Sequence, residues 1–238
     1  MIDYSLYPAE IQALLKSANA EIKDAMYKLS IGAIDVNEWV AIMRRILAKS
    51  QSLAYLAGVG ATSFIPEQLQ IVARNIARQF PFLRRFARVL QNEIDAGNID
   101  SIIEKFSRRA ELYTQTITSN YWQGRGYGKP APPAYPGDGT SQCLTQCRCR
   151  LEYEELDRDK GDWNIYWRLG EAEHCQTCRT RAREWSPLRY RGGRLILPGQ
   201  RYLSPEAAAE GTGVRFGRQL QKEKEIADII SRYTGTDR

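Results

Sequence analysis

The chain has 238 residues, of which 43% are hydrophobic and 26% are charged, a balance that is ordinary for a folded globular protein. The net charge of +6 is modest. No run of about 18 apolar residues occurs, and the first residues lack the basic start and apolar stretch of a secretory signal. We therefore expect a cytoplasmic protein that does not enter a membrane.

Residues 1–123 carry apolar side chains at steps of three and four, which predicts a domain of packed helices. The first stripe covers residues 11–29. Asp35 with Glu38 three positions later has the pattern of a capping box, which predicts the start of a second helix. Gly58-Val59-Gly60 should end that helix, since glycine commonly closes a helical C-terminus.

Two prolines mark helix boundaries in residues 66–94. Pro66 is expected to start a third helix, and Pro81 should break or kink it before the pattern resumes up to residue 94. Ser101 and Glu104 form another capping-box pattern ahead of a long stripe that ends near Tyr121. These stripes are typical of core packing and indicate a helical bundle.

The character of the chain changes at Gly124. Residues 124–136 are rich in glycine and proline and are predicted to be a linker, and residues 137–203 form a cysteine-rich module. Helical periodicity is absent there, and residues 149–153, 163–169 and 194–197 are expected to be strands. Residues 204–238 should be a C-terminal helical tail. The predicted class is mainly α, with a helical bundle, a small zinc-stapled α+β module and a C-terminal helix.

All five cysteines lie within 36 residues, in two groups that suggest a metal site rather than a disulfide framework. The second group has the C-x2-C spacing with which one turn supplies two ligands to a tetrahedral zinc ion. Free buried thiols and disulfides are the alternatives. The predicted cofactor is Zn²⁺, and the predicted ligands are Cys143, Cys147, Cys175 and Cys178, with Cys149 and His174 as alternates.

Catalysis is not expected of this module. His174 is the single histidine of the chain, whereas catalytic zinc sites often use several histidines and keep one open position for water. The H-x-E arrangement of zinc deaminases is absent, and so is a phosphate-binding G-x-x-x-x-G-K-[ST] loop. We therefore predict a protein without catalytic residues.

Arginines gather in two regions with few acidic residues between them. Such clusters favour contact with phosphates or with an acidic protein surface, although a solvated basic face is the simpler alternative. The predicted nucleic-acid or partner-binding residues are Arg74, Arg78, Arg85 and Arg88 in the first region, and Arg179, Arg181, Arg183, Arg189 and Arg191 in the second.

Two stretches of the cysteine-rich module carry recognisable motifs. Residues 136–149 contain the motif C-L-x-x-C-x-C, and residues 170–178 end in H-C-x-x-C and are followed by Trp185-Ser186-Pro187-Leu188. Together these stretches resemble the signature of phage minor head proteins of the Mu F-like head-morphogenesis group. The positions that carry the resemblance are Cys143, Cys147, Cys149, His174, Cys175 and Cys178.

The resemblance implies a structural minor head protein of a tailed phage or prophage, made in the host cytoplasm and built into the virion head. It implies multiple copies around the portal vertex, with the portal protein and the major capsid protein as partners. Its role would lie in head assembly and in DNA packaging or delivery, with possible contact to DNA. The alternative is a nucleic-acid-binding zinc module that serves as a packaging accessory or a regulator.

Overall fold

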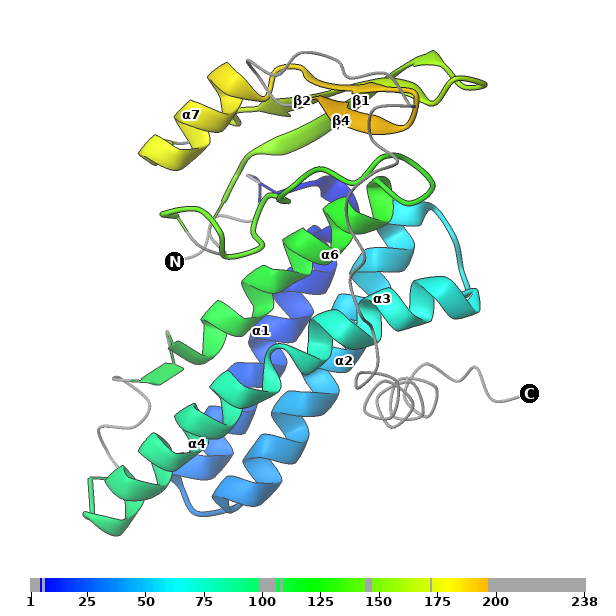
Figure 1. Ribbon diagram of the computed structural model, residues 1–238. Helices are drawn as coiled ribbons and strands as arrows, with labels where there is room; N and C mark the ends of the chain where they lie inside the picture. The colour runs from blue at the N-terminus through cyan, green and yellow to red at the C-terminus, as the bar shows by residue number, and fades with distance from the viewer. Residues whose placement is uncertain are drawn as a thin grey trace, which may run out of the picture.

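The computed structural model describes residue 5 and residues 7–98, 106–107, 109–143, 147–171 and 173–196. Long helices lie side by side in a bundle, and a small sheet with a short helix covers one end of it (Figure 1). The prediction of a mainly helical chain with a small module containing strands is confirmed. The expected C-terminal helix and the Ser101–Glu104 capping box lie outside the described residues.

The first two helices are α1 (Ala9–Ser30) and α2 (Val36–Val59). The predicted capping box of α2 is confirmed, because the backbone N–H of Glu38 donates to Asp35 Oδ1 (2.7 Å) and that of Asp35 donates to Glu38 Oε2 (2.9 Å). Gly60 ends α2 with a φ of 77°, a left-handed conformation that costs glycine little. Local sequence therefore sets both ends of this helix.

Helices α3 (Pro66–Ala77) and α4 (Phe80–Asp95) are separated by a break, as predicted. Pro81 lies in the first turn of α4 rather than at the break itself, since the first-turn N–H groups have no helical partner to lose. A 3₁₀ turn, η2 (Leu112–Gln115), then leads into α6 (Thr116–Arg125). No helix in the described ranges combines the length and the apolarity that a bilayer span requires.

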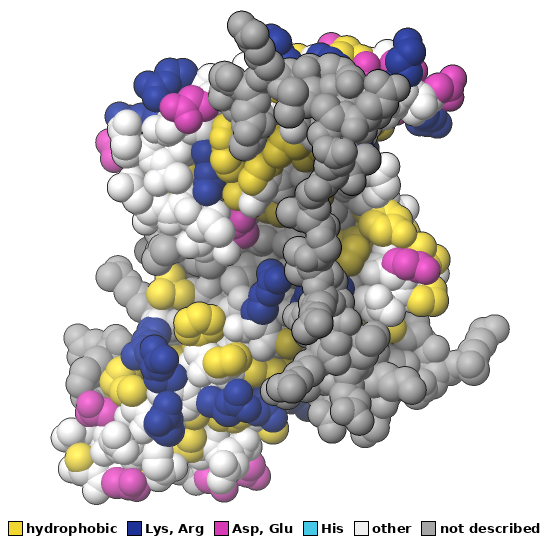
Figure 2. All heavy atoms as spheres, viewed as in Figure 1, with side chains coloured by type: hydrophobic (Ala, Val, Ile, Leu, Met, Phe, Trp, Pro, Cys, Tyr) yellow, Lys and Arg dark blue, Asp and Glu magenta, His cyan; other side chains and the backbone are white. Residues whose placement is uncertain are grey.

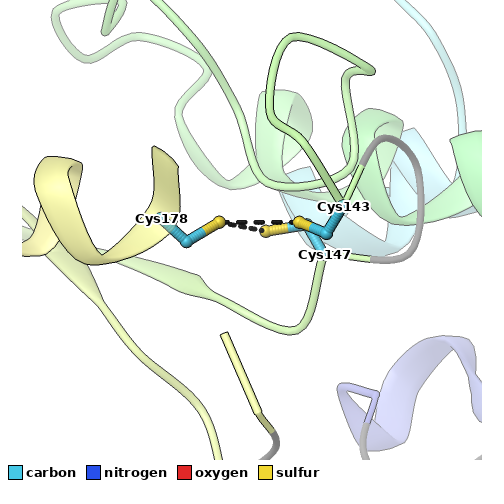
Figure 3. Close-up of side chains that lie close together, drawn as sticks. All are labelled: Cys143, Cys147 and Cys178. Atoms are coloured by element: carbon cyan, nitrogen blue, oxygen red, sulfur yellow. Dashed lines mark hydrogen bonds between the residues drawn. The ribbon is translucent and has the colours of Figure 1, made fainter. Parts of the chain in front are cut away.

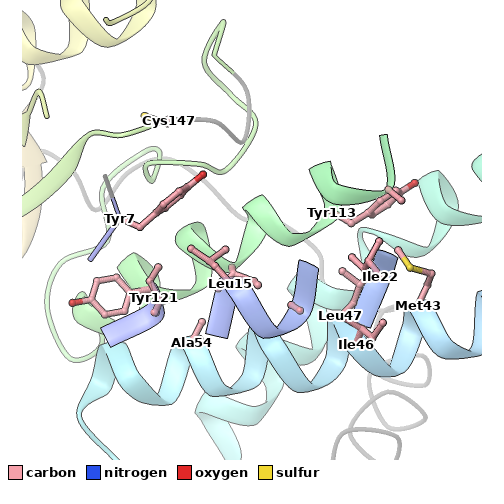
Figure 4. Close-up of a cluster of buried hydrophobic side chains, with 14 of the residues drawn as sticks. Tyr7, Leu15, Ile22, Met43, Ile46, Leu47, Ala54, Tyr113, Tyr121 and Cys147 are labelled. Carbon is pink, nitrogen blue, oxygen red and sulfur yellow. The ribbon is translucent and has the colours of Figure 1, made fainter. Parts of the chain in front are cut away.

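One large cluster of buried apolar side chains runs through the bundle and continues into the cysteine-rich module (Figure 4). Burying one leucine or isoleucine side chain contributes about 1.5–3 kcal/mol, so this cluster supplies the main driving force for the fold. Because the cluster is continuous, the bundle provides a surface on which the module packs. Its members include Leu15 and Ile22 of α1, Met43 and Leu47 of α2, and Cys147.

Polar side chains are buried where α2, α3 and α6 meet. Asn120 of α6 donates to Gln51 Oε1 (3.1 Å) and accepts from Asn75 Nδ2 (2.9 Å), while Gln51 donates to Thr116 Oγ1 (2.9 Å). Buried amides are costly unless they are satisfied, so this network restricts the three helices to one arrangement.

Replacing Asn120 with alanine should therefore destabilise the chain by about 2 kcal/mol, because the Gln51 carbonyl loses its donor in a buried site. Asn37, an exposed residue of α2, provides the matched control, and Asn37→Ala should change stability by less than about 0.5 kcal/mol. Chemical denaturation of both variants measures the difference. Equal stabilities for the two would contradict a structural role of the network.

The module contains a four-stranded antiparallel sheet in the order β1 (Arg150–Asp157), β2 (Asp162–Arg168), β3 (Leu188–Arg191) and β4 (Arg194–Ile196). Gly192 and Gly193 both have positive φ and close the tight β3–β4 hairpin. Helix α7 (Gln176–Glu184) connects β2 to β3. The module therefore combines a helix with strands, as the predicted α+β class requires, although the sequence did not locate this helix. Cys178 is the one residue of α7 that is fully buried, so the helix has no apolar stripe to signal it.

Candidate metal centre

Three thiols from two separate segments converge beside α7. The Sγ atom of Cys178 lies 3.6 Å from that of Cys143 and 3.5 Å from that of Cys147. All three sulfur atoms lie within 4.8 Å of one another. Figure 3 shows Cys178 pointing from its helix toward the two cysteines of the loop that precedes β1.

These separations fit a tetrahedral metal site. Ligands about 2.3 Å from a central ion at tetrahedral angles lie about 3.8 Å from one another, close to the observed spacing. A disulfide requires about 2.05 Å between its sulfur atoms, and all five cysteines are free. Three predicted ligands are thus positioned to hold one metal ion.

Arg181 fastens α7 to the loop that carries two of the thiols. Its Nη2 atom donates to the hydroxyl of Thr140 (2.9 Å), and its guanidinium carbon lies 5.0 Å from the ring centre of Trp167 and 4.9 Å from that of Trp185. The guanidinium therefore joins the loop, the sheet and the helix. Arg181, a predicted partner-binding residue, thus also makes contacts that hold the metal-binding segments together.

Cys175, the fourth predicted ligand, is the N-cap residue of α7. Burial raises the pKa of its thiol, but the backbone N–H groups of Cys178 and Cys143 outweigh that effect and bring the pKa down to about 7. Backbone N–H groups at a helix N-terminus stabilise a thiolate in this way. The position therefore favours the charged form that binds metal.

The two alternate ligands face each other next to the three-thiol cluster. His174 Nδ1 lies 3.7 Å from Cys149 Sγ, and His174 Nε2 donates to the carbonyl of Gly170 (2.9 Å). A histidine whose second ring nitrogen donates to a backbone carbonyl is oriented as metal-binding histidines usually are. Geometry alone leaves Cys175, Cys149 and His174 as candidates for the fourth ligand.

Hydrogen bonds among the thiols shift their pKa values in opposite directions. Hydrogen bonds from the Cys149 and Cys178 thiols lower the pKa of Cys147 to about 2. The same interactions raise the pKa of Cys149 to about 12 and raise that of Cys178. Cys147 is thus the thiol of the cluster that loses its proton most readily, and a bound metal ion would displace the protons of the others.

Two further arginines of the second region also make contacts within the chain. Arg191 is half-buried and donates to the carbonyl of Trp163 (3.0 Å) and to Asn164 Oδ1 (3.1 Å). Arg183 pairs with the neighbouring Glu184 (2.9 Å). The remaining predicted binding residues have exposed side chains: Arg74, Arg78, Arg85, Arg88, Arg179 and Arg189.

The chain matches no family model, no curated protein and no solved structure. Its function is therefore inferred from its own residues, from their arrangement and from the resemblance of its cysteine motifs.

Proposed function

We propose that this chain is a structural, non-enzymatic minor head protein of a tailed phage or prophage. The observation that carries the proposal is the convergence of Cys143, Cys147 and Cys178, because these thiols come from the two stretches that resemble the head-morphogenesis signature. Motifs 31 residues apart, counted between Cys147 and Cys178, are expected to meet if they serve one site.

The proposed ion is one Zn²⁺ held by Cys143, Cys147, Cys175 and Cys178. Four protein ligands close a zinc site to water, which is the arrangement of structural rather than catalytic zinc. Such an ion would join the loop before β1 to α7, a helix in which Cys178 is the one buried residue. Its contribution is stability of the module, in addition to the contacts that Arg181 already makes.

The proposed mechanism is association without chemistry. The helical bundle and the module pack together through their shared apolar cluster, and exposed arginines on both are available to partners. The partners that the resemblance implies are the portal protein and the major capsid protein, in a head that also holds DNA. Multiple copies around the portal vertex would place the chain where it can assist packaging or delivery.

Co-purification tests this proposal. We expect tagged chain, expressed together with the portal and major capsid proteins of the same phage or prophage, to retain the portal protein through size-exclusion chromatography. The double variant Cys175→Ser/Cys178→Ser should lose zinc and weaken this retention, because the module would no longer be rigid. Wild-type, zinc-loaded chain that retains neither protein would refute the assignment to the head.

The second candidate is a nucleic-acid-binding zinc module, and exposed Arg179 and Arg189 on the module favour it. Phosphate contacts release counterions, so DNA binding should weaken steeply as salt rises. A gel-shift titration at low and high salt measures this dependence. Complete absence of retardation at low salt would exclude the second candidate and leave the first intact.

A further inference from the structure

A groove of about 830 Å³ lies between α2 and α4. The sheet and α7 cover the other end of the bundle (Figure 1). Four arginines line the groove, Arg44 from α2 and Arg84, Arg85 and Arg88 from α4. On the face seen in Figure 2, basic side chains gather among apolar ones over the part of the bundle where Figure 1 shows α4. The volume of the groove lies in the upper part of the usual range for binding pockets, roughly 300–1,000 Å³.

The two helices hold these arginines in fixed positions. Helix α4 buries Leu83, Phe86 and Leu90 on one side, so its arginines necessarily point away from the core. Arg44 lies with its guanidinium carbon 5.1 Å from the ring centre of Phe80, which restrains it at the edge of the groove. The positive charges are therefore arranged before any partner arrives.

Their charge is not balanced within the groove. No acidic residue lines it, and the ion pairs found among the described residues include none of these four arginines. By contrast, Arg158 and Arg168 on the sheet pair with glutamates. Four unpaired guanidinium groups around one groove repel each other and favour an anionic partner.

The floor of the groove identifies the kind of anion. Val40 and Ala41 of α2 and Ala87 of α4 also line the groove and supply its apolar surface, here called the floor. Duplex DNA would engage the guanidinium groups through phosphates but would leave this apolar surface unfilled. An amphipathic helix with acidic side chains can do both, since its apolar side chains fill the floor while its carboxylates meet the arginines.

We propose that the α2–α4 groove binds an acidic amphipathic helix of a partner protein. The inference rests on the association role proposed above, and supplies it with a partner of defined chemistry. It does not involve the metal centre, so the two can be tested separately.

The test uses the full, metal-loaded chain and two fluorescein-labelled probes. One probe is a synthetic amphipathic helix with leucines on one face and glutamates on the other, and the second is a DNA duplex of about 20 base pairs. Fluorescence anisotropy should show saturable binding of the peptide. The variant Arg44→Ala/Arg88→Ala should weaken it by roughly tenfold or more, the effect of losing about one charged hydrogen bond.

Two matched variants make the test specific. Arg45→Ala removes an exposed arginine of α2 that does not line the groove, and it should leave peptide binding unchanged. Ala41→Gln obstructs the floor without changing charge, and it should weaken peptide binding while leaving any DNA binding as it was. Circular dichroism of every variant verifies that the bundle is folded.

Three outcomes would overturn the proposal: no peptide binding by the wild type, an equal loss with Arg45→Ala, or tighter binding of DNA together with no effect of Ala41→Gln. The last result would identify a phosphate-binding surface instead. Zinc content measured in the same samples should equal that of the wild type. If the chain binds the peptide but does not retain the portal protein in the co-purification, the result contradicts the assignment to the phage head. It does not contradict the proposed binding of an acidic helix in the groove.

Discussion

Cys178→Ser should abolish stoichiometric metal binding, because Cys178 contributes the sulfur that lies within 3.6 Å of both partner thiols. Elemental analysis by mass spectrometry should find about one zinc per wild-type chain and almost none in the variant. Structural zinc contributes about 10–16 kcal/mol to the folding of isolated zinc-finger peptides. Loss of the ion should therefore destabilise the whole cysteine-rich module. The helical bundle, whose core lies mainly in the helices, should keep its circular dichroism spectrum.

Limited proteolysis gives an independent readout of the same variant. Arg179, Arg181 and Arg183 make α7 a tryptic target, and the wild type should resist cleavage there while metal is bound. Cleavage in α7 should appear in Cys178→Ser and, equally, in wild type treated with a chelator. Metal-free wild type that resists trypsin as well as the loaded form would show that the thiols need no ion.

The fourth ligand can be assigned in the same experiment. Cys175→Ser should lower zinc occupancy, whereas Cys149→Ser and His174→Ala should retain about one zinc per chain. Cobalt-substituted protein provides a second readout, since the strength of the thiolate-to-cobalt absorption reports the number of sulfur ligands. Retention of the full absorption in Cys175→Ser would transfer the role to Cys149 or His174, whichever of the two variants at those positions loses zinc.

Gly58→Ala should destabilise the bundle by about 3 kcal/mol, although helix propensity alone predicts a gain of about 1 kcal/mol. A Cβ atom at this position of α2 would lie 2.1 Å from the carbonyl oxygen of Tyr121 in α6. Gly124 makes the reciprocal approach, with a Cβ atom 2.2 Å from the carbonyl oxygen of Tyr55. Both contacts are with backbone, so neither can be relieved by a side-chain rotation.

Thermal unfolding measures this effect, with an expected decrease of roughly 6–12 °C for a chain of this size. The decrease in melting temperature of the double variant Gly58→Ala/Gly124→Ala should be smaller than the sum of the decreases of the two single variants, because the first substitution already separates the two helices. A melting temperature for Gly58→Ala at or above that of the wild type would show that α2 and α6 do not approach this closely.

The starts and ends of the helices could be predicted from the sequence, because they depend on residues that are neighbours in the chain. Asp35 and Glu38 form a capping box wherever they start a helix, Gly60 ends it, and Pro66 begins the next one. The paired spacing of the cysteines likewise predicted a common metal site, and three of the four predicted ligands, Cys143, Cys147 and Cys178, lie close enough together to hold one ion.

The roles of several residues depend on segments that are far apart in the chain, and these roles became visible only in the folded structure. Gly58 was predicted to end a helix, but it is buried at a crossing whose partner is about 65 residues away. Arg44 was not singled out, because the groove it lines exists only once α2 packs against α4. Arg181 and Arg191 were predicted to bind a partner, and the folded module gives both side chains additional contacts within the chain. Periodicity and spacing report local geometry, whereas these roles depend on which elements pack together.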